Sequence, residues 1–245
     1  MNIIVTENYA ELSDKAAGII AQKITEKPDA VLGLATGSTP LGLYREFIRL
    51  FGCKKIDLSQ VVTFNLDEYV GLEAQNPQSY RYFMHKNLFD HVNIKPENIF
   101  IPNGQAENFE KECRDYENKI KKHGGIDLQI LGIGHDGHIG FNEPGSLCDS
   151  RTRVVDLDAQ TIQDNSRFFN NNLDQVPKQA ITMGIATILD ARACLLLASG
   201  ANKAAIVARA LQGPVTPAVP ASFLQTHKNL IVILDKEAAA NINKN

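Results

Sequence analysis

The chain has 245 residues, of which 44% are hydrophobic and 22% are charged, a composition typical of a globular protein and not of a disordered chain. Its 25 basic and 28 acidic residues leave a formal net charge of −3, so nothing indicates the concentrated basic face that nucleic acids or anionic membranes require. No apolar run is long enough to span a bilayer, and residues 1–7 lack the features of a secretory signal. The cysteines form no Cys-x-x-Cys pair, so we expect reduced thiols and a cytoplasmic protein; they are Cys53, Cys113, Cys148 and Cys194.

Apolar runs and helical patterns alternate along the chain. They predict strands at residues 2–6, 30–35, 61–66, 128–133, 194–198 and 230–234, and helices at 11–27, 41–51, 79–89, 109–123, 201–211 and 236–242. This alternation predicts an α/β fold, namely a single-domain, Rossmann-like three-layer sandwich over residues 1–245, with a mainly parallel sheet and helices on both faces. The polar segment 158–178 interrupts the pattern, and we expect it to form a loop, an irregular helix or a mobile flap.

In sheets of this kind, ligands bind where strands end and helices begin. At the first such junction, Pro40 fits the first helical position and Thr39 fits the N-cap. The preceding turn offers a glycine and three hydroxyls, from Thr36, Gly37, Ser38 and Thr39, to the positive end of the helix. This arrangement favours a bound phosphate. A plain capped turn is the alternative, and neither a P-loop nor a dinucleotide-binding turn is present.

Two basic residues are further candidates for phosphate contacts. Lys203 falls in the first turn of a predicted helix, where a cation is unfavourable against the helix dipole unless an anion lies between them. The alternative is that Lys203 extends into solvent. Arg167 lies in the polar segment and would reach the phosphate from a flap.

Asp67 and Glu68 directly follow the predicted strand 61–66. Carboxylates in this position are unfavourable unless they are solvated, paired or used in a reaction. Asp67 is therefore a candidate general base with Glu68 as its structural neighbour, and a helix-capping aspartate is the alternative.

The glycine-rich junction 132–145 combines histidines with carboxylates: His135, Asp136, His138 and Glu143. A histidine between carboxylates can carry protons near neutral pH, because its unperturbed pKa is about 6.5. A metal site built from His135, His138 and a carboxylate is the alternative. The remaining histidines are expected to be surface or packing residues; they are His85, His91, His123 and His227.

Four segments together carry a resemblance to a known family. They are LGLATGSTP (32–40), VVTFNLDEYVGL (61–72), GHDGHIGFNEP (134–144) and NSRFF (165–169). Their order and spacing resemble those of the glucosamine-6-phosphate deaminase family, of the short non-allosteric type, over essentially the full chain. The resemblance implies a hydrolase of amino-sugar (N-acetylglucosamine) catabolism that converts D-glucosamine 6-phosphate and water to D-fructose 6-phosphate and ammonia, with no metal or organic cofactor.

The same resemblance implies a role for each matched residue. His138 would open the sugar ring, Asp136 and Glu143 would orient it and stabilise its charge, and Asp67 would move a proton from carbon 2 to carbon 1 through an enolamine. His135 is not expected to be required. The phosphate would be held by the turn and by both basic residues, with the flap closed: Thr36, Gly37, Ser38, Thr39, Lys203 and Arg167.

Longer members of this family are hexamers activated by N-acetylglucosamine 6-phosphate, with a basic residue just after a Ser-Arg-Thr-Arg segment. Here residues 150–153 are followed by Val154 and Val155. We therefore expect a monomer or small homo-oligomer without strong activation, whose partner is a small amino-sugar phosphate and neither a nucleic acid nor a membrane.

Two other functions are weighed against the deaminase. A non-catalytic sugar-phosphate sensor, of the kind fused to DNA-binding domains, would need the phosphate turn but not Asp67, His138 and Glu143. Such a sensor usually needs a helix-turn-helix module, and we expect no room for one in this chain. A 6-phosphogluconolactone hydrolase would leave Asp67 unexplained.

Overall fold

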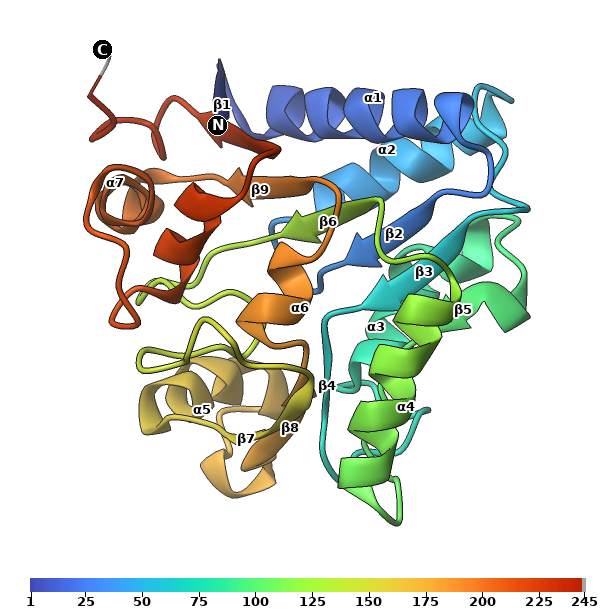
Figure 1. Ribbon diagram of the computed structural model, residues 1–245, viewed down its shortest axis with the longest axis vertical. Coiled ribbons are helices and arrows are strands. Elements are labelled where there is room, and N and C mark those ends of the chain that lie inside the picture. The colour runs from blue at the N-terminus through green and yellow to red at the C-terminus, as the bar shows by residue number, and fades with distance from the viewer. Residues whose placement is uncertain (244–245) are drawn as a thin grey trace.

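A seven-stranded sheet runs through the centre of the structure, and all of its neighbouring strands are parallel (Figure 1). This computed structural model describes residues 1–243, and it describes their side chains except those of residues 164, 167 and 168. The strand order is β1-β10-β9-β6-β2-β3-β5. The bounds are β1 (Asn2–Thr6), β2 (Val31–Leu34), β3 (Val62–Asn65), β5 (Ile99–Phe100), β6 (Leu128–Leu131), β9 (Cys194–Ala198) and β10 (Leu230–Asp235).

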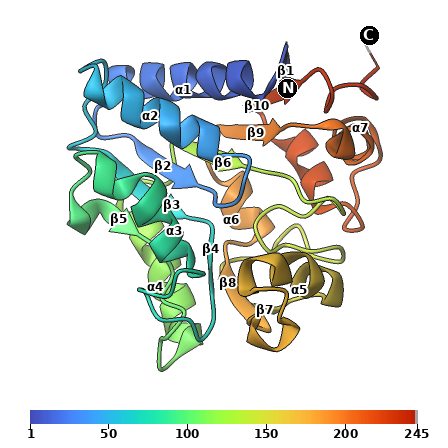
Figure 2. The same ribbon diagram turned by 180° about the vertical axis from the view of Figure 1, so that it is seen from behind.

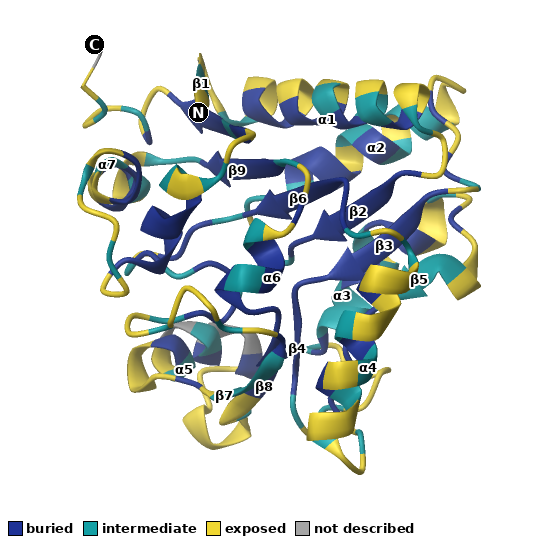
Figure 3. Ribbon diagram, in the orientation of Figure 1, coloured by how far each residue is buried: buried dark blue, intermediate teal, exposed yellow. Residues whose placement is uncertain are grey.

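Helices cover both faces of this sheet. One face packs against α1 (Tyr9–Glu26), α2 (Leu41–Gly52) and α3 (Tyr80–Asn87), which lie in front in Figure 2. The other face packs against α4 (Phe109–Lys122), α6 (Ile185–Leu189) and α7 (Ala204–Gln212). Figure 3 shows the central strands buried and the outer surfaces of α1 and α4 exposed. The predicted α/β fold, with a mainly parallel sheet between two helical layers, is confirmed.

Inner strands such as β2 and β9 are continuous apolar runs, as is typical of strands whose two faces are both buried. On β9, Leu195 and Leu197 belong to the cluster under α1 and α2, whereas Cys194 and Leu196 belong to the cluster under α6 and α7. No described helix is long and apolar enough to cross a membrane.

A second, smaller sheet of three antiparallel strands was not predicted. Its order is β4 (Asp67–Tyr69), β8 (Gln179–Thr182) and β7 (Arg153–Asp156), and Asp67 pairs with Thr182. Helix α5 (Ala159–Asn165) lies beside it, so the polar segment begins with a helix (Figure 1). Short 3₁₀ helices complete the chain at Phe89–His91, Pro96–Asn98, Ser166–Phe169, Leu173–Gln175, Ala201–Lys203 and Pro220–Thr226.

One predicted helix is wrong. Residues 236–242 form successive turns, in which the N–H groups of Ala240 and Ile242 donate three residues back, to Glu237 O (3.3 Å) and Ala239 O (3.0 Å). At the start of the segment, the Asp235 carboxylate accepts the Ala238 N–H at 2.8 Å. The apolar residues have helical spacing, but most of the backbone bonds do not follow the α-helical pattern.

The growth direction of the sheet reverses between β2 and β6. From β2 the chain continues outward through β3 to β5, whereas from β6 it continues the opposite way through β9 to β10. In doubly wound sheets, ligands bind outside the carboxyl ends of the strands at such a point. The loops that follow β2, β3, β6 and β9 carry most of the predicted site residues.

Candidate active site

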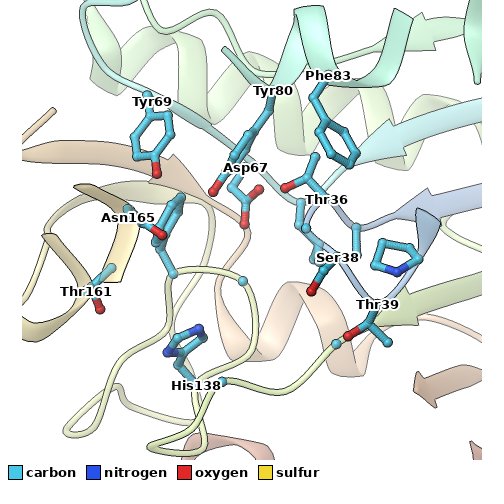
Figure 4. Close-up of a pocket in the computed structure, with 18 of the residues that line it drawn as sticks. Thr36, Ser38, Thr39, Asp67, Tyr69, Tyr80, Phe83, His138, Thr161 and Asn165 are labelled. Carbon is cyan, nitrogen blue, oxygen red and sulfur yellow. The ribbon is translucent and has the colours of Figure 1, made fainter. Parts of the chain in front are cut away.

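A cavity of about 360 Å³ opens at the carboxyl ends of the central strands (Figure 4). It brings together predicted residues from separate loops: Thr36, Gly37, Ser38, Thr39, Asp67, His138 and Lys203. Asp136 and Glu143 are not among its lining residues. The side chain of Arg167 lies outside the residues that the structure describes.

The turn after β2 presents unused hydrogen-bond donors to this cavity. Within the described chain, the backbone N–H groups of Gly37, Ser38 and Thr39 donate to no protein acceptor. Gly37 has a φ of +102°, a conformation that side chains disfavour, and it lets the backbone turn here. Free N–H groups, neighbouring hydroxyls and the N-terminus of α2 together make a site for an anion.

The predicted capping role of Thr39 is wrong. The N-cap position of α2 is Pro40, and no side chain of the cap bonds to the helix. Thr39 lines the cavity instead.

Lys203 occupies the predicted junction between β9 and α7. It ends the 3₁₀ turn before α7, and its ammonium group donates to Ile133 O at 2.8 Å, beside the cavity. The turn is fixed by the Asp235 carboxylate, which accepts hydrogen bonds from the Ser199 hydroxyl (2.5 Å) and the Gly200 N–H (3.0 Å). The cation is thus held at the carboxyl ends of the strands by a rigid backbone.

Asp67 begins β4 and is only 5% exposed. Its burial, together with the nearby charge of Glu68, raises the pKa of this carboxyl to about 8. A Cβ added to Gly140 would lie 3.3 Å from Asp67 Oδ2, so the loop that carries His138 passes directly beside the carboxyl group. Asp67 is therefore a candidate general base at the cavity, because a carboxyl with a raised pKa accepts a proton more readily than an ordinary one.

Glu68 points away from the reaction site and stabilises the start of α3. Its carboxylate accepts the backbone N–H groups of Tyr69 (2.9 Å), Tyr80 (2.9 Å) and Arg81 (2.8 Å). Burial raises the pKa of Glu68, and these three hydrogen bonds oppose that shift. The geometry agrees with the expectation that Glu68 is a structural neighbour of the base.

His138 pairs with Asp136. His138 Nδ1 lies 2.8 Å from Asp136 Oδ1, and the His138 backbone N–H donates to the same oxygen at 3.0 Å. Although burial opposes it, the contact with His138 lowers the pKa of Asp136 to about 2. The ring packs so closely on Gly134 that a Cβ there would lie 2.3 Å from Nδ1. The imidazole is therefore fixed at the edge of the cavity that holds Asp67 (Figure 4).

Glu143 contacts the polar segment. Its Oε2 accepts the backbone N–H of Asp158, the N-cap residue of α5, at 2.8 Å, and its Oε1 is buried without a hydrogen-bond partner among the described side chains. The carboxylate paired with His138 in the structure is Asp136. A contact of Glu143 with the histidine remains a prediction.

Sequence reasoning missed an aromatic wall of the cavity. The rings of Tyr80 and Phe141 stack with centroids 5.9 Å apart, and Tyr69 lies 5.5 Å from Phe141. Thr161 and Asn165 of α5 also line the cavity, so the polar segment forms part of its wall (Figure 4). Aromatic residues at helical or strand spacing indicate a core as readily as a binding site, and no signal in the sequence separates the two.

The described side chains do not assemble the alternative metal site. No group of three or more His, Cys, Asp or Glu residues among them is placed to hold a metal ion. The rings of His135 and His138 are 6.5 Å apart, centre to centre.

Comparison with known proteins gives the relatives of this chain. Residues 6–232 match the family model of glucosamine-6-phosphate isomerases/6-phosphogluconolactonase. Glucosamine-6-phosphate deaminase of Clostridium botulinum (strain Kyoto / Type A2) is 55% identical over 243 residues, which are 99% of each chain. The enzyme of the same name from Thermoanaerobacter sp. (strain X514) is 54% identical over 99% of this chain and 95% of its own.

Solved structures agree with these relatives. A monomeric glucosamine-6-phosphate deaminase superposes with a TM-score of 0.95 at 49% identity, over 98% of this chain and 100% of its own. The 6-phosphogluconolactonase from Leishmania guyanensis has a TM-score of 0.76 at 22% identity over 99% of each chain, a likeness of fold alone. The chain therefore belongs to the family of glucosamine-6-phosphate isomerases and 6-phosphogluconolactonases.

Proposed function

We propose that this protein is a glucosamine-6-phosphate deaminase, which converts D-glucosamine 6-phosphate and water to D-fructose 6-phosphate and ammonia. The observation that carries the proposal is the cavity in which a buried Asp67 faces the same space as His138 and the anion-binding turn 36–39. The near-full-length relatives at 54–55% identity bear this name.

The reaction begins with the phosphate anchored at the turn 36–39 and Lys203. Anchoring one end of the sugar places carbons 1 and 2 at a fixed distance from the acid–base groups. His138 then transfers the proton that opens the pyranose ring to the free aldehyde. Asp136 holds the imidazole through Nδ1 and stabilises its positive charge.

Asp67 carries out the isomerisation. The carboxylate takes the proton from carbon 2, which the neighbouring carbonyl and ammonium groups acidify. The electron pair forms a double bond between carbons 1 and 2 while the carbonyl oxygen gains a proton and the ammonium group loses one, which gives the enolamine. The same proton returns to carbon 1, which leaves an imine at carbon 2. Water adds to the imine and ammonia leaves, so the ketose is formed without any group other than acids and bases. The substrate ammonium also favours the ionised form of Asp67, which lowers its pKa from the value in the empty site.

The polar segment 158–178 would close over the bound sugar and bring Arg167 to the phosphate. Two observations support this role: Thr161 and Asn165 already line the cavity, and Asp158 is hydrogen-bonded to Glu143 of the histidine loop. Closure would keep the enolamine from side reactions with water. We further propose that the protein acts in the cytoplasm, as a monomer or small homo-oligomer without strong activation by N-acetylglucosamine 6-phosphate.

The test is ammonia release from glucosamine 6-phosphate in the presence of a metal chelator, by the unchanged protein and by Asp67→Asn. The unchanged protein should release ammonia with the chelator present, and the variant should lose at least about 100-fold in kcat. Asp29→Asn, at an exposed aspartate, is the matched control and should keep full activity. A folded protein that binds the sugar phosphate but releases no ammonia would refute the proposal.

A further inference from the structure

The hydroxyl of Tyr9 contacts the turn 36–39, although Tyr9 is not among the residues that line the cavity. Tyr9 is the first residue of α1, which is capped by Asn8. Its hydroxyl oxygen accepts the backbone N–H of Gly42 at 2.7 Å. Two carbonyl oxygens face the same hydroxyl as acceptors of its one proton, Ser38 O at 3.0 Å and Thr39 O at 2.9 Å.

This contact replaces the missing cap of α2. The first N–H groups of any helix lack partners within the helix, and a side chain at the N-cap usually accepts one of them. Here Pro40 offers no such side chain, and the Tyr9 hydroxyl, from another helix, accepts the N–H of Gly42. The start of α2 and the turn before it are thus tied to one phenol group.

The contact also sets the direction of a donor in the turn. A trans peptide is planar, so the carbonyl of Ser38 and the N–H of Thr39 point in opposite directions. Because the Ser38 carbonyl points to Tyr9, the Thr39 N–H points away from Tyr9, and it donates to no acceptor in the described chain. Both residues line the cavity, so this N–H is available to the phosphate.

Close packing of α1 and α2 keeps the phenol in place. A Cβ added to Gly42 would lie 2.9 Å from Tyr9 Cζ and 2.1 Å from Ser13 Oγ. Ser13 Oγ in turn donates to Tyr9 O at 2.8 Å, one turn earlier on α1. The two helices can therefore approach this closely only because residue 42 is a glycine.

We propose that Tyr9 is a positioning residue for the substrate phosphate, which acts by holding the turn 36–39 in its anion-binding conformation. This inference rests on the proposed function of that turn. Tyr9 itself is not among the residues that line the cavity, so its effect on the reaction is indirect.

The test is Tyr9→Phe, which removes one oxygen and keeps the ring. KM for glucosamine 6-phosphate and the inhibition constant of inorganic phosphate should both rise by about three- to tenfold. This increase corresponds to the loss of one hydrogen bond. The kcat should stay within about twofold, because Asp67 and His138 are not moved. Tyr82→Phe is the matched control: Tyr82 is a half-buried tyrosine of α3 whose hydroxyl makes no hydrogen bond in the described chain, and both constants should stay unchanged.

A third variant separates failure of this inference from failure of the proposed site. Ser38→Ala should raise the inhibition constant of phosphate if the turn binds phosphate at all. If Ser38→Ala raises it and Tyr9→Phe does not, the role of Tyr9 is refuted and the site stands. If neither variant changes it, the phosphate lies elsewhere and both proposals fall. A Tyr9→Phe protein with reduced kcat, a lowered unfolding midpoint and an unchanged inhibition constant would show a merely structural residue and overturn the inference.

Discussion

Replacing Asp67 by Asn should abolish activity and at the same time stabilise the protein, by an amount that grows with pH. Folding raises the pKa of this carboxyl from 3.8 to about 8. Its contribution to stability is therefore fully present below about pH 4 and is lost as the pH rises through about 8. Each pH unit in this window corresponds to about 1.4 kcal/mol, so the ionised carboxyl of the unfolded chain opposes folding by up to about 4 kcal/mol at pH 7 and about 1–2 kcal/mol at pH 5.

The measurement is urea-induced unfolding, followed by far-UV circular dichroism because the chain has no tryptophan. Titrating groups that do not interact with Asp67 contribute equally to both proteins, and burial of the amide is the same at both pH values. The stability difference between Asp67→Asn and the unchanged protein should therefore grow by about 2–3 kcal/mol from pH 5 to pH 7. Asp29→Asn, at an exposed site, is the matched control for the loss of one carboxylate. A stability difference for Asp67→Asn that is the same at pH 5 and pH 7 would refute the assignment of a raised pKa.

Three further results are expected. Gly134→Ala places a Cβ 2.3 Å from the His138 ring, so kcat should fall at least about tenfold. The inhibition constant of inorganic phosphate should stay within about twofold, and a weakened phosphate affinity would contradict this prediction. In the unchanged protein, kcat/KM should rise as the pH rises through about 8, because the free enzyme must lose the proton of Asp67; a profile flat from pH 6 to 9 would exclude Asp67 as the base. Glu68→Ala leaves one buried and two partly buried N–H groups without an acceptor, so the free energy of unfolding should fall by about 2–3 kcal/mol. In the same variant kcat/KM should reach its plateau at lower pH because a neighbouring negative charge is gone; an unshifted profile would show that the two carboxyls do not interact.

Six strands of the central sheet could be predicted from the sequence, chiefly because the inner ones are buried on both faces; β5, which has only two half-buried residues, was not predicted. A continuous apolar run such as that of β2 or β9 is typical of a strand in this environment, and the helices between the strands carry clear apolar stripes. The small sheet could not be predicted in this way. Its strands have three or four residues with several polar side chains, and β4 obtains its hydrogen bonds from β8, which is distant along the chain.

The residues of the candidate site likewise differ in how well the sequence predicts them. Asp67, His138 and the turn 36–39 stand out because polar and glycine residues directly follow buried strands. The aromatic wall does not stand out, because Tyr80 and Phe141 fit a core pattern equally well. The contact of Tyr9 with the turn depends on how closely α1 approaches α2, a distance that only the packed helices define.

Because β1 pairs with β10, the central sheet is completed only after β10 has been synthesised. Thr6 Oγ1 donates to Leu234 O, across 228 positions of the chain. A ribosome that adds 5–20 residues per second needs roughly ten to fifty seconds between the synthesis of these two strands. Throughout that interval β1 has no strand to pair with, so the nascent chain carries an unpaired strand edge. The α1 helix, which carries Tyr9, becomes anchored on both sides only when translation reaches β10.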